Sequence, residues 1–110
     1  MLPSESSLPI ARRATWRDTE CLELVCGIAN ASGGRLILDA DVDSRGAVKR
    51  RTSRLMKTIP GLIAQSLNLT CAVELVLDSG RFCLEVVIPP ANDPISFRYI
   101  FLFYKDGEKH

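Results

Sequence analysis

Residues 27–46, GIANASGGRLILDADVDSRG, contain the end of one structural element and the whole of the next. Apolar residues at helical spacing continue up to Ala31, two glycines follow, and an apolar run then ends in alternating aspartates. A left-handed residue after the last turn of a helix is least costly as glycine, so we expect Gly33 and Gly34 to end the helix. The stretch therefore predicts a helix that turns sharply into a β-strand.

Upstream of this turn, the apolar residues repeat at helical spacing back to about residue 18. We expect Thr15 or Asp18 to cap this helix, because short oxygen-bearing side chains satisfy the free amides of a first turn. Residues 1–14 contain two prolines and three serines. That composition disfavours a helix, so an extended arm or edge strand is expected there.

Downstream, residues 35–41 are expected to form a strand and residues 44–51 a loop or hairpin around Gly46. Residues 53–67 have helical spacing interrupted by Pro60, which predicts either a kink or a fresh helix starting near Thr58. Strands are expected at 70–77, 81–89 and 96–105, the first two joined by a tight turn, and a polar tail at 108–110. This order predicts an α+β fold, with a mixed sheet of about four to five strands and two or three helices packed on one face.

Length and composition indicate one soluble domain spanning residues 1–110. The formal net charge is +1, so any surface for nucleic acid has to be local. The four cysteines lack a CxxC pair and the single histidine, His110, is terminal, which argues against zinc. Free cysteines inside apolar segments favour a reducing, cytoplasmic setting. We expect no signal peptide, no membrane association and no cofactor.

A local run of positive charge follows the aspartates. It comprises Arg45, Lys49, Arg50, Arg51, Arg54 and Lys57. Such a group can neutralise phosphates without reading any base, and Arg12, Arg13 and Arg17 form a second group near the start of the chain. The alternative is a solvated helix start whose arginines compensate the charge of the nearby aspartates.

The aspartates themselves are a second candidate site. Alternation along a strand would place Asp39, Asp41 and Asp43 on one face, as carboxylates converge on a magnesium ion. A metal site normally needs a further carboxylate, for which Glu5 is the best donor. The alternative is a strand end or edge protected by charge.

Aromatic residues dominate the expected last strand, at positions 97, 99, 101, 103 and 104. Interleaved with Arg98 and Lys105, they could stack on exposed bases. The alternative, which we favour, is a core strand or an interface to another domain or a second subunit. Gly33 and Gly34 do not form a phosphate-binding loop, because they follow a helix and precede a strand.

The stretch GIANASGG at residues 27–34, followed by an apolar strand that ends in aspartates and a glycine, resembles the AxANxxGG element of the Schlafen/AlbA-type domain and is called by that name below. The positions that match are Ala29, Asn30, Gly33 and Gly34. That domain is associated with DNA binding and stands at the N-terminus of RecG-helicase-related proteins and transcription regulators. The stretches LEVVIPPANDPISF and FYKDG resemble later parts of the same family, with Lys105 where arginine is usual. The resemblance spans about Glu5 to Gly107 and implies that the chain is the N-terminal part of a longer protein.

The chain departs from the family where nucleolytic members hold a divalent ion with two glutamates and an aspartate. Glu5 matches the first glutamate and Asp41 the aspartate, but Ile10 stands where the second glutamate would be. The family's strand glycine is also replaced, by Asp39. The resemblance therefore implies no catalytic residues and no metal site, with Glu5, Asp41 and Asp43 as the nearest approach to one.

Together these patterns favour a DNA-binding module that contacts the phosphate backbone without catalysis, DNA being preferred to RNA. The expected contact residues are Arg12, Arg13, Arg45, Lys49, Arg50, Arg51, Arg54 and Lys105. Two alternatives stay open. One is an interaction module that docks onto downstream domains or forms a homodimer, and the other is a degenerate metal-dependent nuclease.

Overall fold

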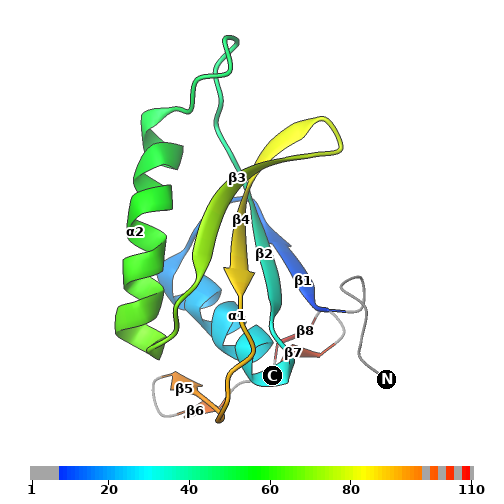
Figure 1. The fold of residues 1–110 in the computed structure, drawn as a ribbon, viewed down its shortest axis with the longest axis vertical. Coiled ribbons are helices and arrows are strands. Elements are labelled where there is room, and N and C mark those ends of the chain that lie inside the picture. Colours follow the sequence, from blue (N-terminus) through cyan, green and yellow to red (C-terminus); the bar gives the residue numbers. More distant parts are fainter. Residues whose placement is uncertain (1–7, 98–99, 102–103, 106–107, 110) are drawn as a thin grey trace.

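The computed structural model describes residues 8–97, 100–101, 104–105 and 108–109, with side chains for residues 8–97. Its main elements are β1 (Ile10–Arg13), α1 (Asp18–Ala31), β2 (Gly34–Asp39), α2 (Arg50–Leu67), β3 (Ala72–Asp78) and β4 (Arg81–Ile88). Four two-residue strands follow: β5 (Ser96–Phe97), β6 (Ile100–Phe101), β7 (Tyr104–Lys105) and β8 (Glu108–Lys109). Figure 1 shows the arrangement.

The main sheet has the strand order β1-β2-β4-β3. β1 runs parallel to β2, while β2–β4 and β3–β4 are antiparallel pairs, so the sheet is mixed. In Figure 1, α1 crosses one face of the sheet and α2 lies along its β3 side. The predicted α+β fold, with two helices on a four-stranded mixed sheet, is confirmed.

Both helices and the two central strands contribute to one hydrophobic core. Its largest fully buried side chains come from α1 (Leu24, Val25, Ile28), β2 (Leu36, Leu38), α2 (Ile59, Ile63) and β4 (Leu84, Val86). The strand residues alternate in sequence, which places them on the same face of the sheet. Burying each such side chain contributes about 1.5–3 kcal/mol, so this shared core holds the helices against the sheet.

The AxANxxGG element forms the junction at the end of α1. The side-chain amide of Asn30 donates to the Ile95 carbonyl at 2.8 Å and accepts from the Ile95 amide at 2.7 Å. Gly33 has a φ of +79°, and a Cβ there would lie 2.8 Å from the carbonyl oxygen of Ile88. A Cβ on Gly34 would overlap the carbonyl oxygen of Pro9. These residues therefore bring three distant backbone segments together.

The predicted capping residue at the start of α1 was wrong. Arg17 occupies the N-cap position, and no side chain caps the helix there. Asp18 is already helical and instead accepts a hydrogen bond of 2.6 Å from the Trp16 indole. Thr15 accepts a hydrogen bond from Arg51 at 2.5 Å. A tertiary contact has thus taken the oxygen that the local pattern assigned to capping.

The second helix also differs from its prediction, because it begins at Arg50 and continues through Pro60. A fresh helix near Thr58 is not found. A proline in a helix interior loses one backbone hydrogen bond. Ile59 and Ile63 are both fully buried, so packing on either side of the proline favours one continuous helix.

Two strand predictions need correction. β2 ends at Asp39 rather than at residue 41. Residues 96–105 do not form one strand, because β5 pairs antiparallel with β6, and β7 pairs with β8. Phe97 is buried in the core, in agreement with the favoured interpretation of that residue. The side chains at positions 99, 101, 103 and 104 lie outside the described residues.

Candidate nucleic-acid interface

All the charged residues of α2 are positive. They are Arg50, Arg51, Arg54 and Lys57, and the first turn contains no acidic residue. The N-terminus of a helix carries a partial positive charge, so cations in its first turn are unfavourable. The N-cap residue is Lys49 and makes no side-chain hydrogen bond to the free amides. Helix stability therefore does not explain this charge pattern, whereas an external anion would.

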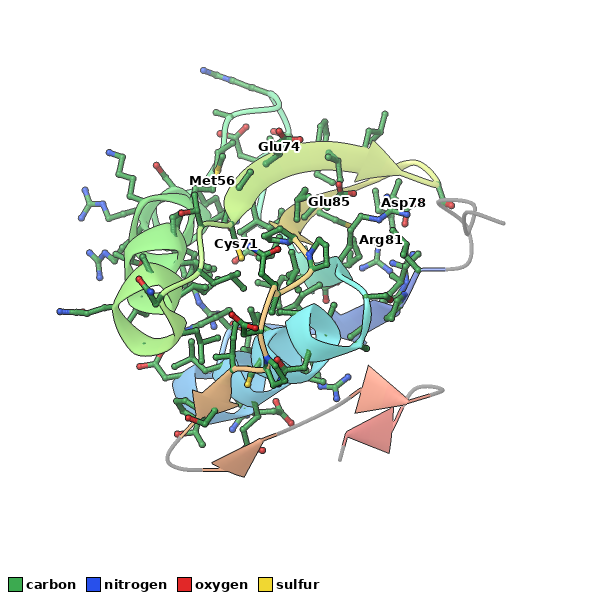
Figure 2. All side chains as sticks on the ribbon, turned by 60° about the horizontal axis from the view of Figure 1, so that its bottom comes forward. Met56, Cys71, Glu74, Asp78, Arg81 and Glu85 are labelled. Carbon is green, nitrogen blue, oxygen red and sulfur yellow. The ribbon has the colours of Figure 1, made fainter. Side chains whose placement is uncertain are left out.

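Three of these cations share one side of the helix. Arg50, Arg54 and Lys57 are spaced by four and three residues, which brings their side chains onto a common face. They line a hollow of about 550 Å³ together with Val48, Ser53 and Thr58. We call this group of six residues the basic hollow. In Figure 2, nitrogen-tipped side chains project from the outer side of α2, away from the sheet.

The cations of the basic hollow are exposed and free of carboxylates. Among the described side chains, ion pairs within 4.0 Å join Arg12 to Asp78, Arg13 to Glu20 and Arg35 to Glu85. None of these involves α2. Arg50 and Arg54 were predicted as phosphate contacts, and Lys57 belonged to the same run. Their positive charge is thus available to a ligand.

The predicted cluster near the start of the chain lies elsewhere. Arg12 reaches across the uncovered face of the sheet to Asp78 at 2.9 Å, and this hydrogen bond raises the pKa of the Arg12 guanidinium. Arg13 lies 3.8 Å from Glu20. The structure therefore does not bring Arg12 and Arg13 together with the basic hollow, although both residues remain exposed enough to contact a ligand.

Arg51 is also separated from its neighbours on α2. Its guanidinium donates to the Thr15 hydroxyl and lines a small cavity of about 140 Å³ that includes Asp39 and Asp41. Arg51 thereby links the start of α2 to the loop before α1. The alternative, in which arginines compensate the charge of nearby aspartates, fits Arg51 better than it fits Arg50 or Arg54.

The remaining predicted cations lie in the loop before α2 or beyond the described side chains. Arg45 is exposed at the tip of this loop, next to Gly46. Lys49 is close enough to Asp43 to help lower the pKa of that carboxyl. The side chain of Lys105 lies outside the described residues. Arg45 and Lys49 border the basic hollow in sequence without lining it.

The three aspartates do not form the single carboxylate face expected of them, because β2 ends at Asp39. Asp43 accepts hydrogen bonds from the amides of Ala47 and Arg45, at 2.9 and 2.8 Å, which lower the pKa of its carboxyl. The amide of Asp41 donates to the Thr52 hydroxyl at 2.8 Å. Among the described residues, no three His, Cys, Asp or Glu side chains are grouped to hold a metal ion. Glu5 lies outside the described residues.

Sequence reasoning did not single out the two hydroxyls of the basic hollow. Ser53 lies three residues after Arg50, and Thr58 four residues after Arg54, so helical spacing could have found both. It did not because the helix was expected to begin only at Ser53. Placing the helix start three residues earlier moves Arg50 from a loop onto the same face.

Two solved structures share this fold. The N-terminal domain of a RecG-related protein from Nitrosomonas europaea matches with a TM-score of 0.63 and 22% identity, over 90% of this chain and 76% of that one. The DIP2311 protein of Corynebacterium diphtheriae matches with a TM-score of 0.62 and 16% identity, over 94% of this chain. The chain spans only 25% of the length of DIP2311.

Comparison with protein-family models finds no match, and no curated protein matches either. The similarity to the two solved structures is thus a similarity of fold. Among the described residues, no helix is long and apolar enough to cross a membrane. At these levels of identity, the neighbours establish the architecture on which the basic hollow is built.

Proposed function

We propose that this domain binds nucleic acid through its phosphate backbone, with the basic hollow as the contact surface and no catalytic step. The observation that carries the proposal is the set of cations on one face of α2 that form no ion pair with any described carboxylate. These cations are Arg50, Arg54 and Lys57. Every charged residue of α2 is positive, although the net charge of the chain is only +1. Lysine and arginine side chains so placed release counterions from a polyanion without reading its sequence.

The relationship to a RecG-related N-terminal domain supports a role connected with nucleic acid, and DNA is the preferred partner. We assign the chain to the Schlafen/AlbA type on the basis of its AxANxxGG element. The match covers 25% of the DIP2311 chain, and by analogy this domain would form one part of a longer protein. Four buried free cysteines suit a reducing compartment, which supports a cytoplasmic location for that protein.

Binding should be measured with labelled DNA over a series of salt concentrations. Charge reversal at Arg50 and Arg54 should abolish binding for all sequences alike, because phosphates carry no sequence information. Arg81→Glu is the matched control, since Arg81 is exposed on β4, outside the basic hollow. Affinity that does not change with salt, or that survives the double reversal, contradicts the proposal.

An interaction module is the second candidate, and an exposed apolar pair favours it. Leu77 and Phe82 are direct cross-strand neighbours near the end of the β3–β4 hairpin, with exposed fractions of 64% and 41%. Sedimentation at increasing concentration tests self-association through this pair. A monodisperse monomer at high concentration excludes a homodimer, and Leu77→Ser with Phe82→Ser should abolish any association that is found.

A further inference from the structure

We propose that the nucleic acid held by the basic hollow is double-stranded, and that α2 follows the phosphates of one strand of a DNA duplex without contacting unpaired bases. This inference rests on the proposed function and specifies its ligand. It is carried by two features of the described residues: the spacing of the cations on a rigid element, and the absence of aromatic side chains beside them.

The spacing of the cations follows from helix geometry. An α-helix rises 1.5 Å per residue, so Arg50 and Arg54 are separated by about 6 Å along the axis, and Arg54 and Lys57 by about 4.5 Å. The three side chains therefore cover about 10 Å. Each strand of a DNA duplex carries one phosphate per about 3.4 Å of its axis, so about three consecutive phosphates fall within that reach.

The rigidity of α2 favours a rigid partner. Ile59, Ile63 and Leu67 are buried in the core, and the first turn is tied to the rest of the molecule by Thr52 and Arg51. Fixed cations match the regular lattice of duplex phosphates without reorganisation. A single strand has a lower charge density and has to be ordered on binding, which costs conformational entropy.

Among the side chains that the structure describes, the hollow also lacks the aromatic rings on which single strands normally stack. Proteins that bind them without sequence preference stack bases on aromatic side chains, which contributes about 1–3 kcal/mol per base. Among residues 8–97 the aromatic side chains are Trp16, Phe82 and Phe97. Trp16 and Phe97 are buried, and Phe82 lies on β4 opposite Leu77. None of these three lines the basic hollow, so no described aromatic ring offers bases a platform there.

The composition of the hollow supports backbone contact as well. Beside its three cations it presents two hydroxyls, from Ser53 and Thr58, and the side chain of Val48. Hydroxyls donate to phosphate oxygens as readily as to bases. A surface of cations and hydroxyls without aromatic rings is therefore suited to duplex phosphates.

The test compares a labelled DNA duplex of about 20 base pairs with one of its own single strands, at several salt concentrations. We expect the duplex to bind at least about five-fold more tightly, with a slope of log K against log[salt] of about −3, from three phosphates at about 0.9 each. The triple variant Arg50→Gln, Arg54→Gln, Lys57→Gln should lose duplex binding. Arg81→Gln should retain it, and circular dichroism should show both variants folded.

The outcomes separate this inference from the proposed function. If neither DNA binds, the proposed function fails and the inference fails with it. If the single strand binds as tightly as the duplex, and the triple variant abolishes both, the domain binds nucleic acid but the duplex assignment is overturned. If duplex binding survives the triple variant, the basic hollow is not the site.

Discussion

Replacing Asn30 should destabilise the whole domain, because its side chain joins α1 to the segment that follows β4. Both polar atoms of the Asn30 amide are hydrogen-bonded to the backbone of Ile95, at 2.7 and 2.8 Å. Asn30→Ala removes both bonds and leaves the amide and carbonyl of Ile95 without these partners. Each lost hydrogen bond costs about 0.5–1.5 kcal/mol. Because both residues are only partly buried, we expect a loss of about 2 kcal/mol in the free energy of unfolding.

Urea denaturation followed by circular dichroism measures this loss, which is a large fraction of the roughly 5–15 kcal/mol that stabilises a typical domain. Thermal unfolding should show a fall of about 10 °C, since about 1 kcal/mol corresponds to 4–8 °C at a size near 100 residues. A difference below about 0.5 kcal/mol between wild type and Asn30→Ala would refute the structural role that we assign to this residue.

Asn30→Asp provides the matched control, because it retains the acceptor for the Ile95 amide and loses only the donor. At neutral pH its carboxylate faces the Ile95 carbonyl, and that repulsion should make it at least as unstable as Asn30→Ala. Protonation supplies a donor again, and the repulsion raises the folded-state pKa of the new carboxyl above its unfolded value of about 4. Asn30→Asp should therefore recover stability relative to Asn30→Ala as the pH falls through that raised pKa, and the recovery should be complete at about pH 4. Equal pH profiles for the two variants would contradict the hydrogen-bond geometry.

Three other predictions follow from local geometry. Gly34→Ala should prevent stable folding, because the new Cβ would overlap the carbonyl oxygen of Pro9. Gly61→Ala should instead stabilise the domain by about 0.5–1 kcal/mol in urea titrations, because a Cβ there meets no other atom and alanine favours a helix over glycine. The lowered pKa of Asp43 means that its stabilisation of the loop is present above about pH 4 and is lost as the pH falls through its folded-state pKa. The protection factors of the amides in residues 42–49, relative to their intrinsic exchange rates, should therefore fall in acid, and Asp43→Ala should remove that dependence. Burial raises the pKa of Cys71 from 9.0 to about 11, so the contribution of this thiol to stability should be constant below about pH 9 and be lost as the pH rises towards 11. Iodoacetamide should react slowly with it at about pH 8.

The sequence predicted the elements whose signals are local. The helix that ends before Gly33 and the hairpin around Gly80 depend on residues within one or two turns, and both are present. The element order then predicts the fold class, because a helix and strands with single apolar faces have to share a core. Local pattern and tertiary structure agree in these segments.

The errors occur where a tertiary contact outweighs a local preference. Thr15 has the side chain of a helix cap, but its hydroxyl accepts from Arg51 instead. Pro60 is a helix breaker by its covalent structure, but buried neighbours on both sides favour one helix. The partner of Thr15 lies 36 residues away, and the core that buries Ile59 and Ile63 is built largely from other elements, so spacing alone could not reveal either effect.

The sequence indicated which residue types make up the candidate site, but not which of those residues lie together. The run of positive charge between residues 45 and 57 was evident, whereas its division between the basic hollow, the contact of Arg51 and the loop required coordinates. Arg12 shows why. It lies on an edge strand, and its partner Asp78 is at the other edge of the sheet. Only the curvature of the folded sheet brings these two side chains together.

The positions that carry the resemblance to a known family are structural. Asn30 holds Ile95, and Gly33 and Gly34 allow the close approach of Ile88 and Pro9. These contacts hold backbone segments together and involve no residue of the basic hollow. The same element can therefore accompany different functions.

The outer face of α2 is under no such constraint. Its cations contact no carboxylate among the described side chains, and Arg50 stands in the first turn of the helix, where positive charge is least favourable. Neutral residues at these positions would pack equally well and remove that cost. Under our proposal a ligand of opposite charge accounts for an arrangement that folding does not require, and so the basic hollow rather than the AxANxxGG element carries the functional argument.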